Sequence, residues 1–282
     1  MAKEVLMRKI TAIRLGPVFL AACAVAMAFA AEEPSDETRN EGHIRSPESR
    51  AKAREMLEAA KRVMEPVESP SEVGTTWISE SYPWLTRRLE AERFLAENDD
   101  EQLDALRGHL GRTIDMFRRI KNLYEDGVVG GEAETYFAWK FYVAEAESWL
   151  IEAGDKVPAN PDADVFTTRA RAGQAMLDAA KSTYQATAAA FGVGRASSSD
   201  VHHWSREWMY SKQRLIDTEK QAIASRRDHL KRMQQLYVKC KALQDGDGDE
   251  GRGENLHAAT YYVAEAEFDV SRYDVAATEE AD

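Results

Sequence analysis

The sequence predicts an all-α protein, an elongated antiparallel bundle of coiled-coil hairpins, and two observations support this fold class. The decapeptide FYVAEAESWL at 141–150 returns as YYVAEAEFDV at 261–270, which indicates a tandem repeat. Apolar residues are spaced by three and four positions from Leu103 to Tyr124, as on a helix face that packs against a partner helix. The repeat and the periodicity together predict two matching sets of paired helices.

The repeat unit is predicted to be 120 residues long, because shifting the chain by that number keeps producing matches without a gap. The matching pairs include Met56 and Met176, Trp84 and Trp204, His109 and His229, Arg112 and Arg232, Glu134 and Glu254, and Ala138 and Ala258. We therefore expect residues 46–153 to form the first helical repeat and residues 166–275 the second. A linker at 154–165, which contains two prolines, would join them.

Each repeat is expected to contain one long helix and two shorter helices. In the first repeat the long helix would span 76–126, which at about 1.5 Å per residue is roughly 75 Å. The shorter helix at 132–153 would continue end to end into the helix at 166–190. The predicted bundle thus has two long helices beside stacked shorter ones, and the other expected helices are 46–65, 199–245 and 253–274.

The repeated decapeptide is predicted to contact two neighbouring helices at once. Tyr142 belongs to one apolar stripe of its helix and Phe141 to the next, so two sides of the helix are apolar. Ala144 would let the helix backbones approach closely. The two glutamates, Glu145 and Glu147, are expected to face solvent.

The first thirty residues have the pattern of a secretory signal peptide. A basic opening precedes an apolar run that ends in Ala28-Phe29-Ala30, a small-residue cleavage site. The alternative is a lipoprotein anchored at Cys23, because Leu20-Ala21-Ala22-Cys23 resembles a lipoprotein cleavage box. Residues 31–45 and 276–282 are expected to be disordered. We therefore expect the protein in the periplasm or cell envelope.

Composition excludes several classes of partner and site. The formal net charge is −12, and removing residues 1–30 takes away four bases and one acid, which leaves −15. Such an acidic chain is a poor ligand for nucleic acid or an anionic membrane. Cys240 would be the one cysteine after cleavage, so neither an internal disulfide nor a thiolate zinc site is expected.

Three motifs suggest chemistry, and each has a simpler explanation. The acidic stretch 245–254 resembles a calcium loop but lacks its glycine and its bidentate glutamate, so a solvated turn fits better. Glu254 and His257 form one Glu-x-x-His pair, whereas a di-iron bundle needs two. His109 and His229 recur at matching positions, which favours a packing role. We expect no cofactor and no catalytic set.

The stretch NLYEDGVVGGEAETYFAWKFYVAEAE at 122–147 resembles the helical-hairpin tip of TolC-type outer-membrane efflux proteins. The resemblance covers the helices only. The ends that carry membrane strands in that family correspond to short turns near 67–75 and 191–199. It implies tandem hairpins whose tips contact a periplasmic adaptor. The matching tip residues would be Gly127, Val128, Val129, Gly130, Gly131, Gly246, Gly248 and Gly251.

These observations lead to one main functional hypothesis and two alternatives. The main hypothesis is a non-enzymatic periplasmic scaffold that binds protein partners and self-associates. The resemblance suggests the first alternative, a component of an efflux or export conduit that contacts an adaptor through its hairpin tips. A metal-binding helical-bundle enzyme is the second alternative.

Overall fold

A computed structural model describes residues 46–68, 81–127, 133–157, 168–216, 218–247 and 253–279. Over these residues the chain forms eight α-helices and no strand, which confirms the all-α fold class. Their bounds are α2 Pro47–Glu68, α4 Tyr82–Leu95, α5 Asp99–Glu125, α6 Ala133–Glu152, α7 Arg169–Gly192, α8 Ser198–Gln213, α9 Glu219–Asp247 and α10 Gly253–Glu279. The predicted signal peptide, Cys23 and residues 31–45 lie outside the described residues.

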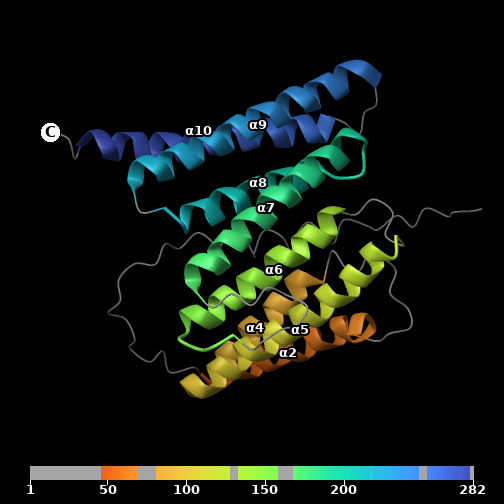
Figure 1. Ribbon diagram of the computed structural model, residues 1–282, viewed down its shortest axis with the longest axis vertical. Helices are drawn as coiled ribbons and strands as arrows, with labels where there is room; N and C mark the ends of the chain where they lie inside the picture. Colours follow the sequence, from red (N-terminus) through yellow and green to blue (C-terminus); the bar gives the residue numbers. More distant parts are fainter. Residues whose placement is uncertain are drawn as a thin grey trace, which may run out of the picture. The chain divides into compact units, whose positions relative to one another are not determined.

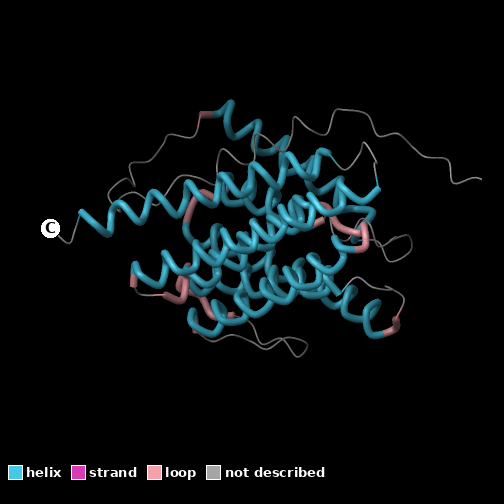
Figure 2. Tube along the Cα trace, turned by 90° about the horizontal axis from the view of Figure 1, so that it is seen from above, coloured by secondary structure: helices cyan, strands magenta, loops and turns pink. Residues whose placement is uncertain are grey.

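Each helix packs against the next one along the chain, from α2 to α10 (Figure 1). Successive helices run in opposite directions, and α10 also contacts α8. Figure 2 shows the same helices from above. None of the described helices is long and apolar enough to cross a membrane.

The predicted end-to-end stacking of two shorter helices is wrong. The helices expected at 132–153 and 166–190 are α6 and α7, and they pack side by side along their lengths (Figure 1). The reason lies in α6, which buries Trp139 against one neighbour and Phe141 against the other. Lateral packing covers both of these apolar sides, whereas end-to-end stacking would leave one exposed.

The predicted uninterrupted helix at 76–126 is also wrong, because the chain breaks between α4 and α5. Ala96 leaves the helical conformation with ψ at 134°, and Asn98 caps α5 by accepting a hydrogen bond from the Glu101 backbone N–H at 2.9 Å. The Glu101 carboxylate in turn accepts from the Glu97 backbone N–H at 2.7 Å. Three acidic residues in the first turn of α5 stabilise this start, because they face the positive end of the helix dipole.

The second expected long helix, 199–245, is broken in the same manner between α8 and α9. Glu219 is the first residue of α9 and Asp99 the first of α5, so these starts lie 120 residues apart. The starts of α6 and α10 are separated by the same number. These coincidences agree with the tandem repeat, which stays a prediction from the sequence.

Two further boundaries differ from expectation. Pro83 lies in the first turn of α4, where its missing N–H costs no helical hydrogen bond, so this proline marks a start. At the other end of the chain α10 continues to Glu279, beyond the predicted boundary at residue 275. Because successive helices run in opposite directions, the ends of α5, α7 and α9 lie on the same side of the helical array (Figure 1).

The core is divided into clusters between consecutive helices. One cluster holds residues from both predicted repeats: Phe141 and Ala144 of α6 pack with Met176 of α7 and Trp204 of α8. The Phe141 and Trp204 rings meet edge to face, with centroids 5.5 Å apart. This shared cluster joins the two halves into one folded unit.

Candidate functional site

The predicted hairpin-tip residues are mostly outside the described part of the chain. Gly127 closes α5 with φ at +67°, a conformation that glycine adopts at little cost. Gly246 lies inside the last turn of α9, where the sequence predicted a loop. The remaining tip candidates, Val128, Val129, Gly130, Gly131, Gly248 and Gly251, are not described. Of the predicted tip residues, Gly127 is therefore the one that the described structure places in a turn.

The structure brings together a polar cluster that the sequence did not predict, where α4, α6 and α8 meet. The Tyr82 hydroxyl donates a hydrogen bond of 2.6 Å to Glu145 Oε2. The Tyr82 ring stacks on Tyr142, with centroids 3.5 Å apart and ring planes 6° from parallel. Glu145 was expected to face solvent, but it is partly buried in this cluster, and Glu147 is fully buried.

The Tyr82 cluster holds a proton close to neutral pH. Burial, followed by the negative charge of Glu207, raises the pKa of Glu145 to about 7, although the Tyr82 hydrogen bond opposes the shift. Burial also raises the pKa of Glu207, and Arg214 opposes that shift. Burial and the Glu145 charge raise the pKa of Tyr82 well above its ordinary value, so its phenol remains the donor.

A second cluster occupies the matching place in the other half, with histidine where the first has tyrosine. The His202 ring stacks on Tyr262, with centroids 3.9 Å apart and planes 3° from parallel. Its Nε2 lies 2.9 Å from Glu265 Oε2, and this contact is an ion pair only when the imidazole is protonated. His202 holds the pKa of Glu265 below its ordinary value, and Arg206 adds to the effect.

The recurring histidines, His109 and His229, are both buried in the helix core. Burial first and a nearby arginine second lower the pKa of each ring to about 3, so both are neutral at physiological pH. His229 Nδ1 lies 2.8 Å from the Ser205 hydroxyl oxygen, which also accepts a hydrogen bond of 2.7 Å from Arg232 Nε.

The Ser205–His229 pair does not form a hydrolytic site. Ser205 is completely buried and His229 is 2% exposed, so a substrate has no access to the hydroxyl. The Arg232 guanidinium points into the serine oxygen, at the place where a catalytic serine needs an approaching carbonyl carbon. This network satisfies buried polar groups between α8 and α9, which is a structural role.

The described residues contain no group of three or more His, Cys, Asp or Glu side chains that could hold a metal ion. Residues 248–252 of the predicted acidic turn lie outside them, while Asp245 and Asp247 belong to the last turn of α9. Cys240 is buried, and burial raises the pKa of its thiol. The buried thiol is therefore poorly suited to act as a nucleophile.

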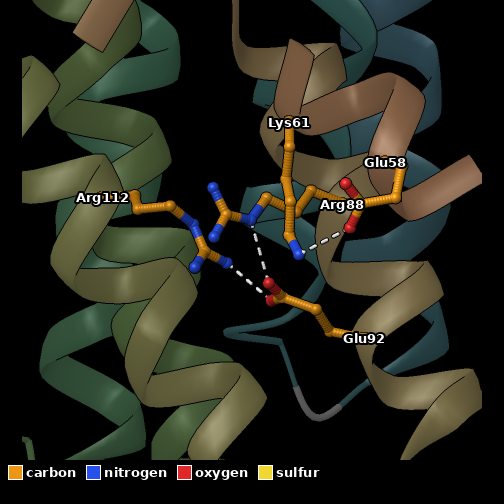
Figure 3. Close-up of polar contacts among 5 residues, drawn as sticks. All are labelled: Glu58, Lys61, Arg88, Glu92 and Arg112. Atoms are coloured by element: carbon orange, nitrogen blue, oxygen red, sulfur yellow. Dashed lines mark hydrogen bonds and ion pairs between the residues drawn. The ribbon is translucent and has the colours of Figure 1, made fainter. Parts of the chain in front are cut away.

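An ionic cluster links α4 to α5 around Glu92 (Figure 3). The two carboxylate oxygens of Glu92 pair with Arg88 Nε at 2.9 Å and with an Arg112 terminal nitrogen at 2.7 Å. All three side chains are less than one-fifth exposed. Figure 3 also shows the neighbouring pair of Lys61 and Glu58 on α2, separated by 2.9 Å.

A groove of about 440 Å³ lies among α7, α8 and α9. Tyr184, Phe191 and Leu236 supply apolar walls, and Lys231 and Lys239 are among its other lining residues. The corresponding space in the first half has a volume of about 320 Å³, and Arg88, Arg112 and Asp115 line it. The two grooves share matching positions such as Leu236 and Met116, but Arg88 and Arg112 correspond to Trp208 and Arg232, which do not line the groove of the second half.

Comparison with known proteins gives no match: no family model, no curated protein and no solved structure resembles the chain. The TolC-type resemblance therefore remains a prediction from the residues at 122–147.

The residues that form the polar clusters had only a weak signal in the sequence. Glu145 and Glu265 occupy matching positions within the identical pentapeptide VAEAE, but their partners Tyr82 and His202 differ and so escape a search for identities. A search for matching positions where one polar ring replaces another would have found them.

Proposed function

We propose that this protein is a non-enzymatic helical scaffold of the cell envelope that binds protein partners and associates with itself. The observation that carries the proposal is the distribution of polar and apolar groups. The described polar networks that could suggest catalysis, such as Ser205 with His229, form hydrogen bonds between helices instead. Large apolar side chains, by contrast, are exposed on turns and outer helices.

The turn between α7 and α8 is the first candidate contact for another protein. Val193 in this turn is 67% exposed, and Gly194 follows with φ at +75°. Tyr124, near the end of α5, is 39% exposed on the same side of the helical array (Figure 1). The exposed valine in this turn and the exposed tyrosine near the end of α5 provide the apolar contacts that a partner surface needs.

Crosslinking in the native envelope tests this proposal. A photo-reactive residue at Val193 is expected to give adducts with other proteins, and the same residue at Arg169 is the control. The Arg169 side chain is 74% exposed at the start of α7, on the opposite side of the array (Figure 1). Adducts of equal yield at both positions, or none at Val193, would refute binding through the turns.

The alternative of an export-conduit component has one observation in its favour. The ends of α5, α7 and α9 lie on one side, so several helical turns could meet a single adaptor (Figure 1). Under this alternative the Val193 adducts contain a periplasmic adaptor, and deletion of the protein changes drug sensitivity or secretion. Unchanged sensitivity together with other adduct partners would exclude the export-conduit alternative and support the scaffold proposal.

A further inference from the structure

One stripe of α10 is exposed although its counterpart on α6 is buried. Phe141 of α6 is 2% exposed, whereas Tyr261 at the matching position of α10 is 64% exposed. Ser148 is 3% exposed, and its counterpart Phe268 is 61% exposed. Ala144 is buried and Ala264 is exposed. The stripe formed by Tyr261, Ala264 and Phe268 is therefore an apolar helix face without a neighbour in the described structure.

A second exposed stripe lies on α2, and comparison with α7 reveals it. Met176 of α7 is 1% exposed, whereas the matching Met56 of α2 is 53% exposed. Ala179 is buried and its counterpart Ala59 is exposed, while Thr183 is buried and Val63 is partly buried. The positions on α2 that face α4, including Ala60, are buried as on α7. The exposed stripe of α2 thus consists of Met56, Ala59 and Val63.

The internal counterparts of these two stripes cover each other. Phe141 and Ala144 of α6 belong to the same core cluster as Met176 and Ala179 of α7. The missing neighbour of α10 is therefore a helix like α7, and the missing neighbour of α2 is a helix like α6. One molecule carries both exposed halves of an interface that it already contains once.

We propose that α10 of one copy packs against α2 of a second copy and reproduces the α6–α7 interface between molecules. The inference rests on the proposed scaffold role and names the surfaces through which copies associate. The two surfaces differ, so the contact is head to tail and builds a closed ring or an open filament. Burying these aromatic and methionine side chains removes apolar surface from water, which favours association.

The internal interface and the proposed interface differ at two matched positions, and the two larger side chains of the proposed interface are compatible with each other. The buried small residues Ser148 and Ala172 lie in the C-terminal half of α6 and the N-terminal half of α7, which are adjacent in this antiparallel pair. Their counterparts are Phe268 and Lys52. A lysine and an aromatic ring attract each other, and the lysine stem adds apolar contact, so the two larger side chains remain compatible.

The test is the mass of the purified chain without residues 1–30, the predicted signal peptide. Light scattering and sedimentation measure this mass at increasing protein concentration. The wild-type chain is expected to form oligomers, and either Phe268→Asp or Met56→Asp is expected to reduce it to the single-chain mass. The matched control is Val238→Asp on α9, which is 64% exposed and belongs to neither stripe, so its oligomers should persist. Circular dichroism establishes that each variant is folded.

Mixing the two defective variants tests the head-to-tail geometry. Phe268→Asp keeps an intact α2 stripe and Met56→Asp keeps an intact α10 stripe, so an equimolar mixture is expected to give a dimer of twice the single-chain mass. A monomeric wild type, oligomers that survive either substitution, or a mixture that stays monomeric would each overturn the proposal. None of these outcomes depends on the adducts at Val193, so binding to other proteins is judged separately.

Discussion

At the residue scale, Glu145 and Glu265 show how surroundings decide the charge of identical sequence. Both lie in the pentapeptide VAEAE, yet the pKa of Glu145 is raised to about 7 and that of Glu265 is lowered. Glu145 faces a neutral phenol and the acidic Glu207, whereas Glu265 faces His202 and Arg206. Where tyrosine occupies the matched position, the pKa of the neighbouring glutamate is raised, and where histidine occupies it, that pKa is lowered.

Glu145→Gln is expected to stabilise the protein at alkaline pH and to have little effect near pH 4. The folded state holds the Glu145 proton more tightly than the unfolded state, so wild-type stability falls as pH rises from about 4.5 through about 7. Glutamine removes this loss and still accepts the Tyr82 hydrogen bond. The gain in the free energy of unfolding should be on the order of 2 kcal/mol at pH 8. Urea unfolding at pH 4, 6 and 8 measures it.

Glu265→Gln is the matched control and should behave in the opposite way. Its lowered pKa stabilises the folded state above pH 4.5, and this contribution is lost as pH falls through the folded-state pKa. The variant should therefore be less stable than wild type at pH 7 and similar to it at low pH. If the two glutamine variants followed the same pH trend, the assignment of opposite environments would be wrong.

Glu92→Ala is expected to destabilise the fold by about 2–3 kcal/mol. The substitution leaves Arg88 and Arg112, each less than one-fifth exposed, without the carboxylate between them. Chemical unfolding at neutral pH measures the loss. The control is Glu55→Ala, which removes an ion pair with Lys52. Both side chains of this pair are about two-thirds exposed, so the free energy of unfolding should change little. Equal effects from both variants would contradict a buried role for Glu92.

At the element scale, the break before α5 depends on a short capping motif. Asn98→Ala removes the acceptor for the Glu101 backbone N–H and should cost about 1 kcal/mol in the free energy of unfolding. Hydrogen exchange should accelerate first in the opening turn of α5. Asn98→Ser retains a side-chain acceptor and should recover most of the loss. A stabilised Asn98→Ala variant would instead mean that α4 and α5 favour one continuous helix.

The sequence predicted which segments are helical, but it did not predict where the two long helices are interrupted. The apolar spacing from Leu103 to Tyr124 does not reach the break, because residues 97–102 are all polar. The information that the spacing missed was local: Asn98 followed by two aspartates and Glu101 is a strong helix start, and Pro83 marks another. The polar run and its capping residues therefore indicate the helix break that the predicted long helix ignored.

At the scale of the whole molecule, side-by-side packing of α6 and α7 changes the meaning of the repeated decapeptide. The sequence predicted a helix that is apolar on two sides, and α6 is buried in that manner. It also predicted that Glu145 and Glu147 face solvent, which is wrong because neighbouring helices surround α6. Periodicity within one helix reports its apolar faces, but the number of helices around it depends on the complete arrangement.

Phe141→Ala and Tyr261→Ala truncate matching positions of the decapeptide and should have very different effects on stability. Phe141 fills the cluster that joins the two halves, so its loss should cost about 3–5 kcal/mol and lower the temperature of unfolding of the whole domain. Tyr261 is 64% exposed within one molecule, so its truncation should change the stability of the monomer by less than about 0.5 kcal/mol. Calorimetry at low protein concentration, where copies do not associate, separates the two. Similar losses would mean that both helices are equally enclosed within the monomer, and neither the junction at α6 nor the open face of α10 would then stand.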